Sequence, residues 1–237
     1  MLGPMEMHLV TWNACKGQFN RKVPLLDQLA ADVAVVQEIA SPGEDTEQTF
    51  WFGDNLRQGL AVIARDPYRL RHLPQQHGVP KFVIPVAVDG PQPFVLFAVW
   101  TQRESRSTRY VRAASTAIDM YASTFRENRV VLLGDFNSNA IWDKHHPADR
   151  NHSAMVGRLA AHGLVSAYHH HTGEIHGQEK QPTLYFRWNQ SKPYHIDYCF
   201  LPRQWADGIQ RVEVGSFDAW RKFSDHRPLS VHFQTEA

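Results

Sequence analysis

Seven acidic, amide and imidazole residues stand at the ends of apolar runs, or inside one, along the chain. They are Asn13, Glu38, Asp135, Asn137, Asp197, Asp225 and His226. Side chains that leave the ends of adjacent strands can converge on one edge of a sheet, where loops are free to specialise. Carboxylate and amide oxygens are hard ligands, which suit Mg²⁺ first and Mn²⁺ second. The set therefore predicts a divalent-metal site of oxygen ligands beside an imidazole.

Asp197 lies within the apolar run His195–Leu201, so its carboxylate is expected to be buried. A buried charge without compensation is strongly unfavourable, and such a group needs a polar partner. His226 is the natural partner, because a carboxylate fixes the tautomer of an imidazole and favours its protonated form. An imidazolium held in this way can face a phosphate.

Each of these residues also has a structural interpretation. Asn13 fits a turn, Glu38 a solvated strand end, Asp135 with Asn137 an Asx turn, and Asp225 a helix N-cap. Local turn chemistry does not require this order of residue types from position 13 to position 226. The complete set therefore favours the functional interpretation.

The elements that must position these residues are short strands and a few helices. Helices are predicted over Val23–Ala31, Tyr110–Phe125 and Ser153–His162, where apolar residues recur at helical spacing. Strands are predicted at runs rich in β-branched and aromatic residues. These runs are His8–Trp12, Val33–Gln37, Leu60–Ala64, Phe82–Val88, Phe94–Trp100, Val130–Leu133, Thr183–Trp188, Ile196–Leu201, Val212–Gly215 and Leu229–Phe233.

So many strands imply two sheets, and the short loops between several of them favour antiparallel pairing. With the helices outside, the expected class is α+β, a four-layered sandwich of two mostly antiparallel sheets flanked by helices. A doubly wound parallel sheet is disfavoured, because it would need a crossover helix after nearly every strand. No linker or repeat divides the sequence, so residues 1–237 are expected to form one domain, with residues 1–6 as a disordered leader.

The composition limits the partners. The 237 residues carry 25 Lys and Arg against 24 Asp and Glu, and this balance disfavours a general electrostatic grip on nucleic acid or an anionic membrane. Two cysteines without a CxxC pair are typical of a reducing compartment. The sequence shows neither a signal-peptide pattern nor an apolar run long enough to span a bilayer. A cytoplasmic protein without membrane insertion or an obligate protein partner is expected.

Five motifs occur in the order found in the endonuclease/exonuclease/phosphatase superfamily, which the chain resembles over nearly its whole length. They are Thr-Trp-Asn13, Val-Gln-Glu38, Gly-Asp135-Phe-Asn137, Ile-Asp197-Tyr and Ser-Asp225-His226. The third and fifth motifs together are specific. Segments 51–55, 134–143, 193–202 and 214–220 are similar to a bacterial branch of the superfamily. The resemblance implies the fold of exonuclease III and deoxyribonuclease I, and metal-dependent hydrolysis of phosphate esters.

The resemblance also implies which residues hold the metal. Glu38 resembles the principal metal-binding glutamate of the superfamily. Asn13 and Asp225 resemble the residues that complete or support the metal site. One ion or two ions are both compatible with this set.

The remaining four residues resemble the groups that act on water and phosphate. Asp135 resembles the aspartate that orients or deprotonates the attacking water, and Asn137 the amide that holds the phosphate or that water. Asp197 and His226 resemble a coupled pair whose histidine contacts the scissile phosphate. These roles imply in-line attack of metal-assisted water.

Trp100 departs from the superfamily pattern. Many members carry His at this strand end, and the abasic-site endonucleases carry Tyr, whereas an indole cannot act as an acid or base at neutral pH. Trp100 either stacks on a base or sugar or, as favoured here, packs against the loop 101–110. Other candidate substrate-binding residues are Lys16, Asn139 and Trp188.

Two histidine-rich segments and one cysteine are predicted to have no catalytic or metal-binding role. Asp143–Pro147 and His169–His171 with His176 contain ligands for a soft metal, but their spacing matches no zinc pattern, and solvated loops are predicted. Cys15 is predicted to be structural, because a thiol nucleophile would need a base.

Three functions fit these observations. The favoured one is a Mg²⁺-dependent phosphodiesterase acting on DNA or RNA, because basic and aromatic residues share the loops near the motifs. The alternative is a hydrolase of a small phosphate ester, such as a nucleotide, an inositol phosphate or a phospholipid head group. The third is a non-catalytic binding module, which the intact set of seven residues disfavours.

Overall fold

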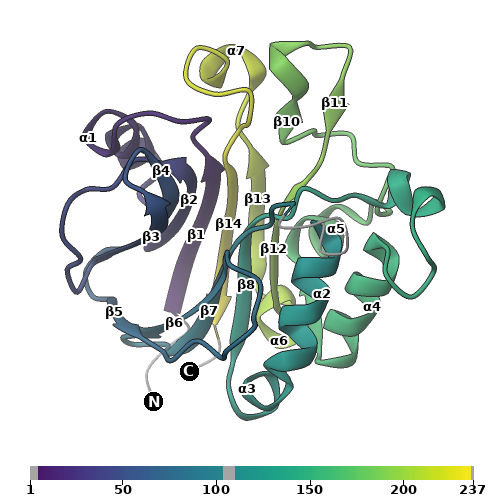
Figure 1. The fold of residues 1–237 in the computed structure, drawn as a ribbon, viewed down its shortest axis with the longest axis horizontal. Helices are drawn as coiled ribbons and strands as arrows, with labels where there is room; N and C mark the ends of the chain where they lie inside the picture. Colours follow the sequence, from purple (N-terminus) through teal and green to yellow (C-terminus); the bar gives the residue numbers. More distant parts are fainter. Residues whose placement is uncertain (1–4, 104–109, 236–237) are drawn as a thin grey trace.

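Two six-stranded sheets form the centre of the computed structural model, which describes residues 5–103 and 110–235 (Figure 1). The first sheet has the order β13-β14-β1-β2-β4-β3 and the second β5-β6-β7-β8-β12-β9. The first comprises β1 (Met5–Asn13), β2 (Val33–Ile39), β3 (Thr49–Asn55), β4 (Gln58–Ala64), β13 (Ile209–Val214) and β14 (Leu229–Thr235). The second comprises β5 (Arg69–His72), β6 (Val83–Asp89), β7 (Phe94–Trp100), β8 (Val130–Asp135), β9 (Leu164–Ser166) and β12 (Asp197–Pro202).

Antiparallel pairing dominates both sheets. Only β1 with β2 and β7 with β8 are parallel among the strand pairs of the described residues. The inner faces bury apolar residues such as Leu9, Val35, Leu96, Leu133 and Val231 in one core between the sheets. The predicted sandwich of two mostly antiparallel sheets is confirmed.

Helices cover the outer face of each sheet. Beside the first sheet lie α1 (Phe19–Lys22), the 3₁₀ helix η1 (Val23–Leu29) and α7 (Phe217–Trp220). Beside the second lie α2 (Val111–Met120), α3 (Ala122–Glu127) and α4 (His152–Ala161). Shorter segments are η2 (Ala140–His145), α5 (Ala167–Thr172), η3 (Phe186–Trp188) and α6 (Arg203–Ala206), together with the hairpin β10 (Leu184–Tyr185) and β11 (Pro193–Tyr194). Within the described ranges, no helix is both long and apolar enough to cross a membrane.

The predicted helices differ from the observed ones in detail. The segment predicted as a helix over Val23–Ala31 is mostly the 3₁₀ helix η1, which has a proline in its first turn and ends at Ala30 in the left-handed conformation. The predicted helix over Tyr110–Phe125 breaks at Tyr121 into α2 and α3. The third begins at His152 rather than Ser153, because the side chain of Asn151 accepts the capping hydrogen bond from the Ala154 amide.

One predicted strand and the predicted leader were wrong in their extent. The run Thr183–Trp188 forms only the short β10 before the backbone turns into η3, where Arg187 and Trp188 have positive φ. Met5 and Glu6 are not part of a disordered leader, because they pair with Thr235 and Gln234 in the first sheet. Residues 1–4 of that predicted leader lie outside the described ranges.

Gly134 allows β8 to lie tightly between β7 and β12, directly before Asp135. Its φ is +153°, and a Cβ atom there would lie 1.9 Å from the carbonyl oxygen of Val99 on β7. The Gly134→Ala variant is therefore expected to lose about 3 kcal/mol or more of unfolding free energy, measured by urea denaturation. The matched control is Gly157→Ala in α4, where a new Cβ meets nothing within 4 Å. That control is expected to gain up to about 1 kcal/mol, and equal stability of the two variants would contradict the argument.

Candidate active site

The predicted site residues gather at one end of the two sheets. Asn13 ends β1 and Asp135 ends β8, while Asp197 begins β12 directly across from Asp135 in the antiparallel pair. Asp225 and His226 precede β14, which runs antiparallel to β1 and therefore starts at the same end. In Figure 1 this is the upper end, where α1, α7 and the β10–β11 hairpin also lie.

Asn13 connects the two sheets at this end. Its Nδ2 donates to Asp135 Oδ2 at 3.0 Å and to Glu38 Oε1 at 3.2 Å. Its Oδ1 accepts from the Cys15 amide at 2.9 Å, and its backbone oxygen accepts from Ser224 Oγ at 2.7 Å. Asn13 is 1% exposed, so one buried amide fixes the relative positions of the Glu38 and Asp135 carboxylates.

Asp135 and Asn137 form a closed local network. Asp135 Oδ1 accepts from the Asn137 amide at 2.8 Å, and Oδ2 accepts from Asn137 Nδ2 at 3.1 Å. Asn137 has φ +46° and also donates to the Thr101 carbonyl oxygen at 3.1 Å. These contacts form the Asx turn that a purely structural role of Asp135 and Asn137 predicts. They also hold the Asn137 side-chain amide beside the fully buried carboxylate of Asp135. The two interpretations are therefore compatible.

Asp197 and His226 form the expected pair. Asp197 Oδ2 lies 3.0 Å from His226 Nδ1, and Asp197 Oδ1 is buried without a hydrogen-bond partner. Burial lowers the pKa of His226, but the charge and hydrogen bond of Asp197 outweigh it and raise that pKa to about 10. Burial, followed by the charge of Asp197, raises the pKa of Asp135 to about 7. One ligand atom from each of these three side chains lies within 4.8 Å of the other two.

Glu38 stands at a distortion of β2. Its φ is +58°, and the pairing of β2 with β4 shifts register between Gln37 and Ile39. A non-glycine residue with this φ is uncommon and indicates a position held by its surroundings. Gln58 Nε2 on β4 donates to Glu38 Oε2 at 3.0 Å. Sequence reasoning missed Gln58, because a single amide at the start of a strand has no distinguishing pattern.

Asp225 and Glu38 both lie near enough to Cys15 to act on its thiol. Asp225 Oδ2 accepts from the Arg187 amide at 3.2 Å. Burial, and then the charges of Asp225 and Glu38, raise the pKa of the Cys15 thiol to about 12. The thiol is therefore protonated at neutral pH and unsuited to act as a nucleophile, in line with the structural role predicted for Cys15.

The charge balance of the site fits a hard divalent cation. The carboxylates of Asp135, Asp197 and Asp225 act on the imidazole of His226, and Asn13 connects a fourth carboxylate, that of Glu38, to Asp135. Like charges in low-dielectric surroundings repel, and burial of a carboxylate without a counter-charge is unfavourable. The unpartnered Asp197 Oδ1 is the clearest sign of incomplete compensation. Oxygen ligands with excess negative charge match the preference of Mg²⁺ or Mn²⁺.

The four candidate substrate-binding residues have different environments. Trp100 is 6% exposed and packs on Phe82 with ring centroids 4.8 Å apart, so its indole lies in the core and is not available for stacking on a substrate, whereas its predicted packing against the loop 101–110 stays a prediction. Part of the loop proposed to cover it, residues 104–109, lies outside the described ranges. Asn139 is 2% exposed, and its Nδ2 atom donates to three groups of the protein interior. Lys16 and Trp188 are exposed.

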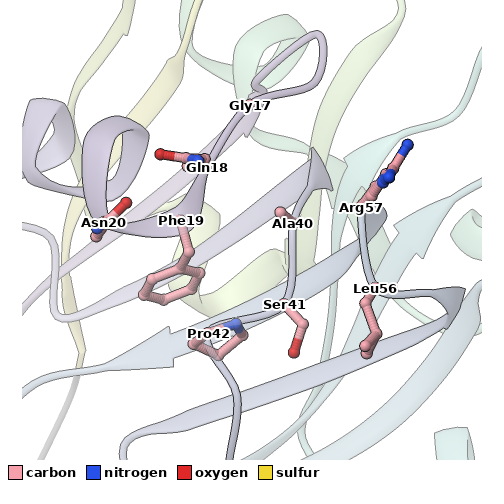
Figure 2. A pocket seen from close by; sticks show the side chains of 9 residues that line it. All are labelled: Gly17, Gln18, Phe19, Asn20, Ala40, Ser41, Pro42, Leu56 and Arg57. Carbon is pink, nitrogen blue, oxygen red and sulfur yellow. The ribbon is translucent and has the colours of Figure 1, made fainter.

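Two pockets flank the site. One, of about 450 Å³, is lined by Asn137 and by the aromatic residues Trp142, Phe186 and Tyr194. The other, of about 670 Å³, lies beyond Glu38 between α1 and the segments that follow β2 and β3, with Arg57 at its rim (Figure 2). Phe186 belongs to the run Thr183–Trp188, which was predicted as a strand, and Tyr194 lies outside the predicted strands, so the sequence did not indicate either ring as part of a pocket.

A sandwich of two sheets with these groups at one end is the architecture of a class of hydrolases that act on phosphate esters. Residues 10–226 match the sequence profile of the Endonuclease/Exonuclease/phosphatase family, and the chain belongs to this family. In a search of curated proteins, no sequence matches the chain.

Solved structures of nucleases share the fold. The endonuclease domain of TRAS1, a telomere-specific non-LTR retrotransposon, is similar with a TM-score of 0.69 at 15% identity, over 97% of this chain and 98% of that one. The 3'-5' exonuclease NExo from Neisseria meningitidis has a TM-score of 0.67 at 18% identity, over 96% and 99%. An AP endonuclease from Archaeoglobus fulgidus has a TM-score of 0.65 at 15% identity, over 96% and 99%. At these identities the likeness shows the common fold.

Proposed function

We propose that this protein is a Mg²⁺-dependent phosphodiesterase that hydrolyses phosphate esters in DNA or RNA, with Mn²⁺ as the alternative ion. The observation that carries the proposal is one connected set of groups at one sheet end. Asn13 links Glu38 to Asp135, and Asp135 lies with Asp197 and His226 in a cluster whose ligand atoms are within 4.8 Å. Family membership and the nuclease fold of the structural neighbours support it.

Glu38, with Asn13 and Asp225, would hold the cation. A bound Mg²⁺ supplies neutralisation of charge on the phosphoryl and leaving oxygens. The positive φ of Glu38 and its hydrogen bonds from Asn13 and Gln58 orient the carboxylate before any ligand arrives. Such preorganisation avoids the free energy of reorienting polar groups during the reaction.

The other residues act on the water and the phosphate. Asp135 accepts the proton of the attacking water. Asn137 donates through Nδ2 to Asp135 and to the Thr101 carbonyl oxygen, so its Oδ1 is the atom that can accept from this water and hold it in place. Asp197 occupies Nδ1 of His226 and keeps the imidazole protonated, so Nε2 can donate to a phosphate oxygen. Charge on the phosphate is thereby stabilised by a donor that the fold holds in place.

The surroundings favour a short or flexible strand of nucleic acid. Trp142, Phe186 and Tyr194 line the pocket beside Asn137, and aromatic rings stack on bases with about 1–3 kcal/mol each. Lys16 and Trp188 are exposed and available as further contacts for phosphate and base. The same pocket, at about 450 Å³, also has the size of a small-ligand site, which supports hydrolysis of a small phosphate ester as the second candidate.

A cleavage panel tests the proposal. Wild type is incubated with Mg²⁺ and end-labelled single- and double-stranded DNA, RNA, an abasic duplex, and bis-p-nitrophenyl phosphate. Cleavage of a nucleic acid is expected, and the product lengths give the polarity. Cleavage of the small diester alone would favour the second candidate, and no cleavage of any substrate would favour a binding module.

A further inference from the structure

A second cluster of metal-binding side chains lies outside the candidate active site. One ligand atom from each of His169, His176 and Glu179 lies within 4.8 Å of the other two. The side chains of His169 and Glu179 are 9% and 4% exposed, and His169 Nε2 lies 3.1 Å from Glu179 Oε1. The solvated loop predicted for these histidines was therefore wrong, because α5 and the segment after it turn His169 and His176 inward. The exposed His171 does follow the prediction.

His195 supplies an independent observation. Its Nδ1 lies 2.7 Å from the Gln181 carbonyl oxygen, which can only accept, so Nδ1 carries the hydrogen. Nε2 is left as an acceptor, and it is buried with no hydrogen-bond partner in a residue only 3% exposed. An unsatisfied buried polar atom is rare and unfavourable, and it calls for a ligand. The His195 ring centroid lies 5.9 Å from that of His169.

The outer hydrogen bonds of His169 and His195 follow the pattern of metal-binding histidines, whereas His176 Nδ1 lies 3.1 Å from His152 Nε2. Such residues usually bond through their second ring nitrogen to an oxygen of the protein, which fixes the ring. His195 does so through the Gln181 carbonyl, and His169 through Nδ1 and Ser166 Oγ at 2.8 Å. Glu179 Oε1 accepts from Asn139 Nδ2 at 3.0 Å, so the carboxylate is also held in place.

We propose that His169, His176 and Glu179 form a structural Zn²⁺ site, with His195 as the fourth protein ligand. Imidazole nitrogens with one carboxylate suit Zn²⁺, whereas the oxygen-rich site around Glu38 suits Mg²⁺. The rings of His169 and His176 are stacked with centroids 3.5 Å apart. An imidazole binds a metal in its own plane, so zinc binding turns one ring out of the stack and draws the ligand atoms together.

The site would join three segments that support the candidate active site. His169 lies on α5, His176 and Glu179 in the segment after it, and His195 two residues before Asp197. Asn139 Nδ2 donates both to Glu179 and to the His195 carbonyl oxygen, at 3.0 and 2.8 Å. A bound ion would therefore stabilise the base of the loop that carries Asn137. The proposal is independent of the proposed hydrolase activity.

Metal binding by the full chain tests the proposal directly. Protein stripped with a chelator is titrated with Zn²⁺ in excess Mg²⁺ by calorimetry, and with Co²⁺ by visible absorption. Wild type is expected to bind one Zn²⁺, to give the intense visible bands of four-coordinate Co²⁺, and to gain about 5–10 °C in Tm at 100-fold excess over Kd. The His176→Gln and Glu179→Gln variants are expected to lose at least about tenfold in Zn²⁺ affinity.

Two controls locate the ion. His171→Gln changes an exposed histidine on the same helix and is expected to bind Zn²⁺ like wild type. Asp135→Asn is also expected to keep the Zn²⁺ site, because it alters only the other cluster. The proposal is overturned if wild type does not bind Zn²⁺, if His176→Gln and Glu179→Gln both bind it like wild type, or if Asp135→Asn removes the binding. Circular dichroism of each metal-free variant distinguishes the loss of a metal-binding side chain from the loss of the fold.

Discussion

The Asp135→Asn variant is expected to lower kcat by about 10²–10⁴-fold while the protein stays folded, because this is the usual effect of removing a general base. The substitution keeps the size of the side chain and the acceptor for the Asn137 amide, 2.8 Å from Oδ1. It removes the group that accepts the proton of water. It also turns an acceptor of Asn13 Nδ2 and Asn137 Nδ2 into a donor, which disturbs the network that orients Asn137.

Single-turnover kinetics on the best substrate of the cleavage panel measure this loss, and thermal unfolding checks the fold. The control is Asp119→Asn, which removes an exposed carboxylate paired with Arg158 at 3.4 Å on the surface. Surface ion pairs contribute little, about 0–1 kcal/mol, so this control is expected to match wild type in both measurements. Activity of Asp135→Asn within tenfold of wild type would remove Asp135 from the mechanism.

The grouping of three site residues could be predicted because each lies at an end of a buried strand. A long apolar run makes the strand recognisable, and a polar side chain at its end needs hydrogen bonds from water or from other protein groups. Asn13, Asp135 and Asp197 fulfil this, and adjacent strands place them at one edge. Glu38 is the instructive case, because a register shift and a positive φ turn it toward Asn13, which no periodicity of the sequence indicates.

The sequence was least informative where tertiary contacts decide the structure. Trp100 ends its strand as Asn13 and Asp135 do, but its indole packs on Phe82 in the core. The strands β3, β5 and β9 were missed because they are short or contain exposed polar residues, and edge strands lack a continuous apolar signal. The hydrophilic run around His169 and His176 predicts a solvated loop, whereas in the structure the two rings stack on each other and His169 pairs with Glu179.

Removal of divalent cations is expected to lower the hydrolysis rate at least about 10³-fold, with recovery when Mg²⁺ is added back. The reason is the excess of carboxylates around His226, which leaves the phosphate of a substrate facing negative charge unless a cation intervenes. The Glu38→Gln variant is expected to raise the Mg²⁺ concentration for half-maximal rate by at least about tenfold. It removes the charge while its amide oxygen can still accept from Asn13.

The hydrolysis rate is measured against Mg²⁺ concentration for wild type and Glu38→Gln. This measurement distinguishes weaker binding of the metal from a slower chemical step. If Glu38 binds the ion, high Mg²⁺ restores part of the rate in Glu38→Gln, whereas it restores none in Asp135→Asn. Mg²⁺ should also raise the Tm of wild type more than that of Glu38→Gln, because an ion stabilises only the fold that binds it. Glu213→Gln, an exposed carboxylate beside Arg211, is the control and should respond like wild type. An identical Mg²⁺ response of Glu38→Gln and wild type would place the ion elsewhere, and full activity after chelation would show that the hydrolysis needs no divalent cation.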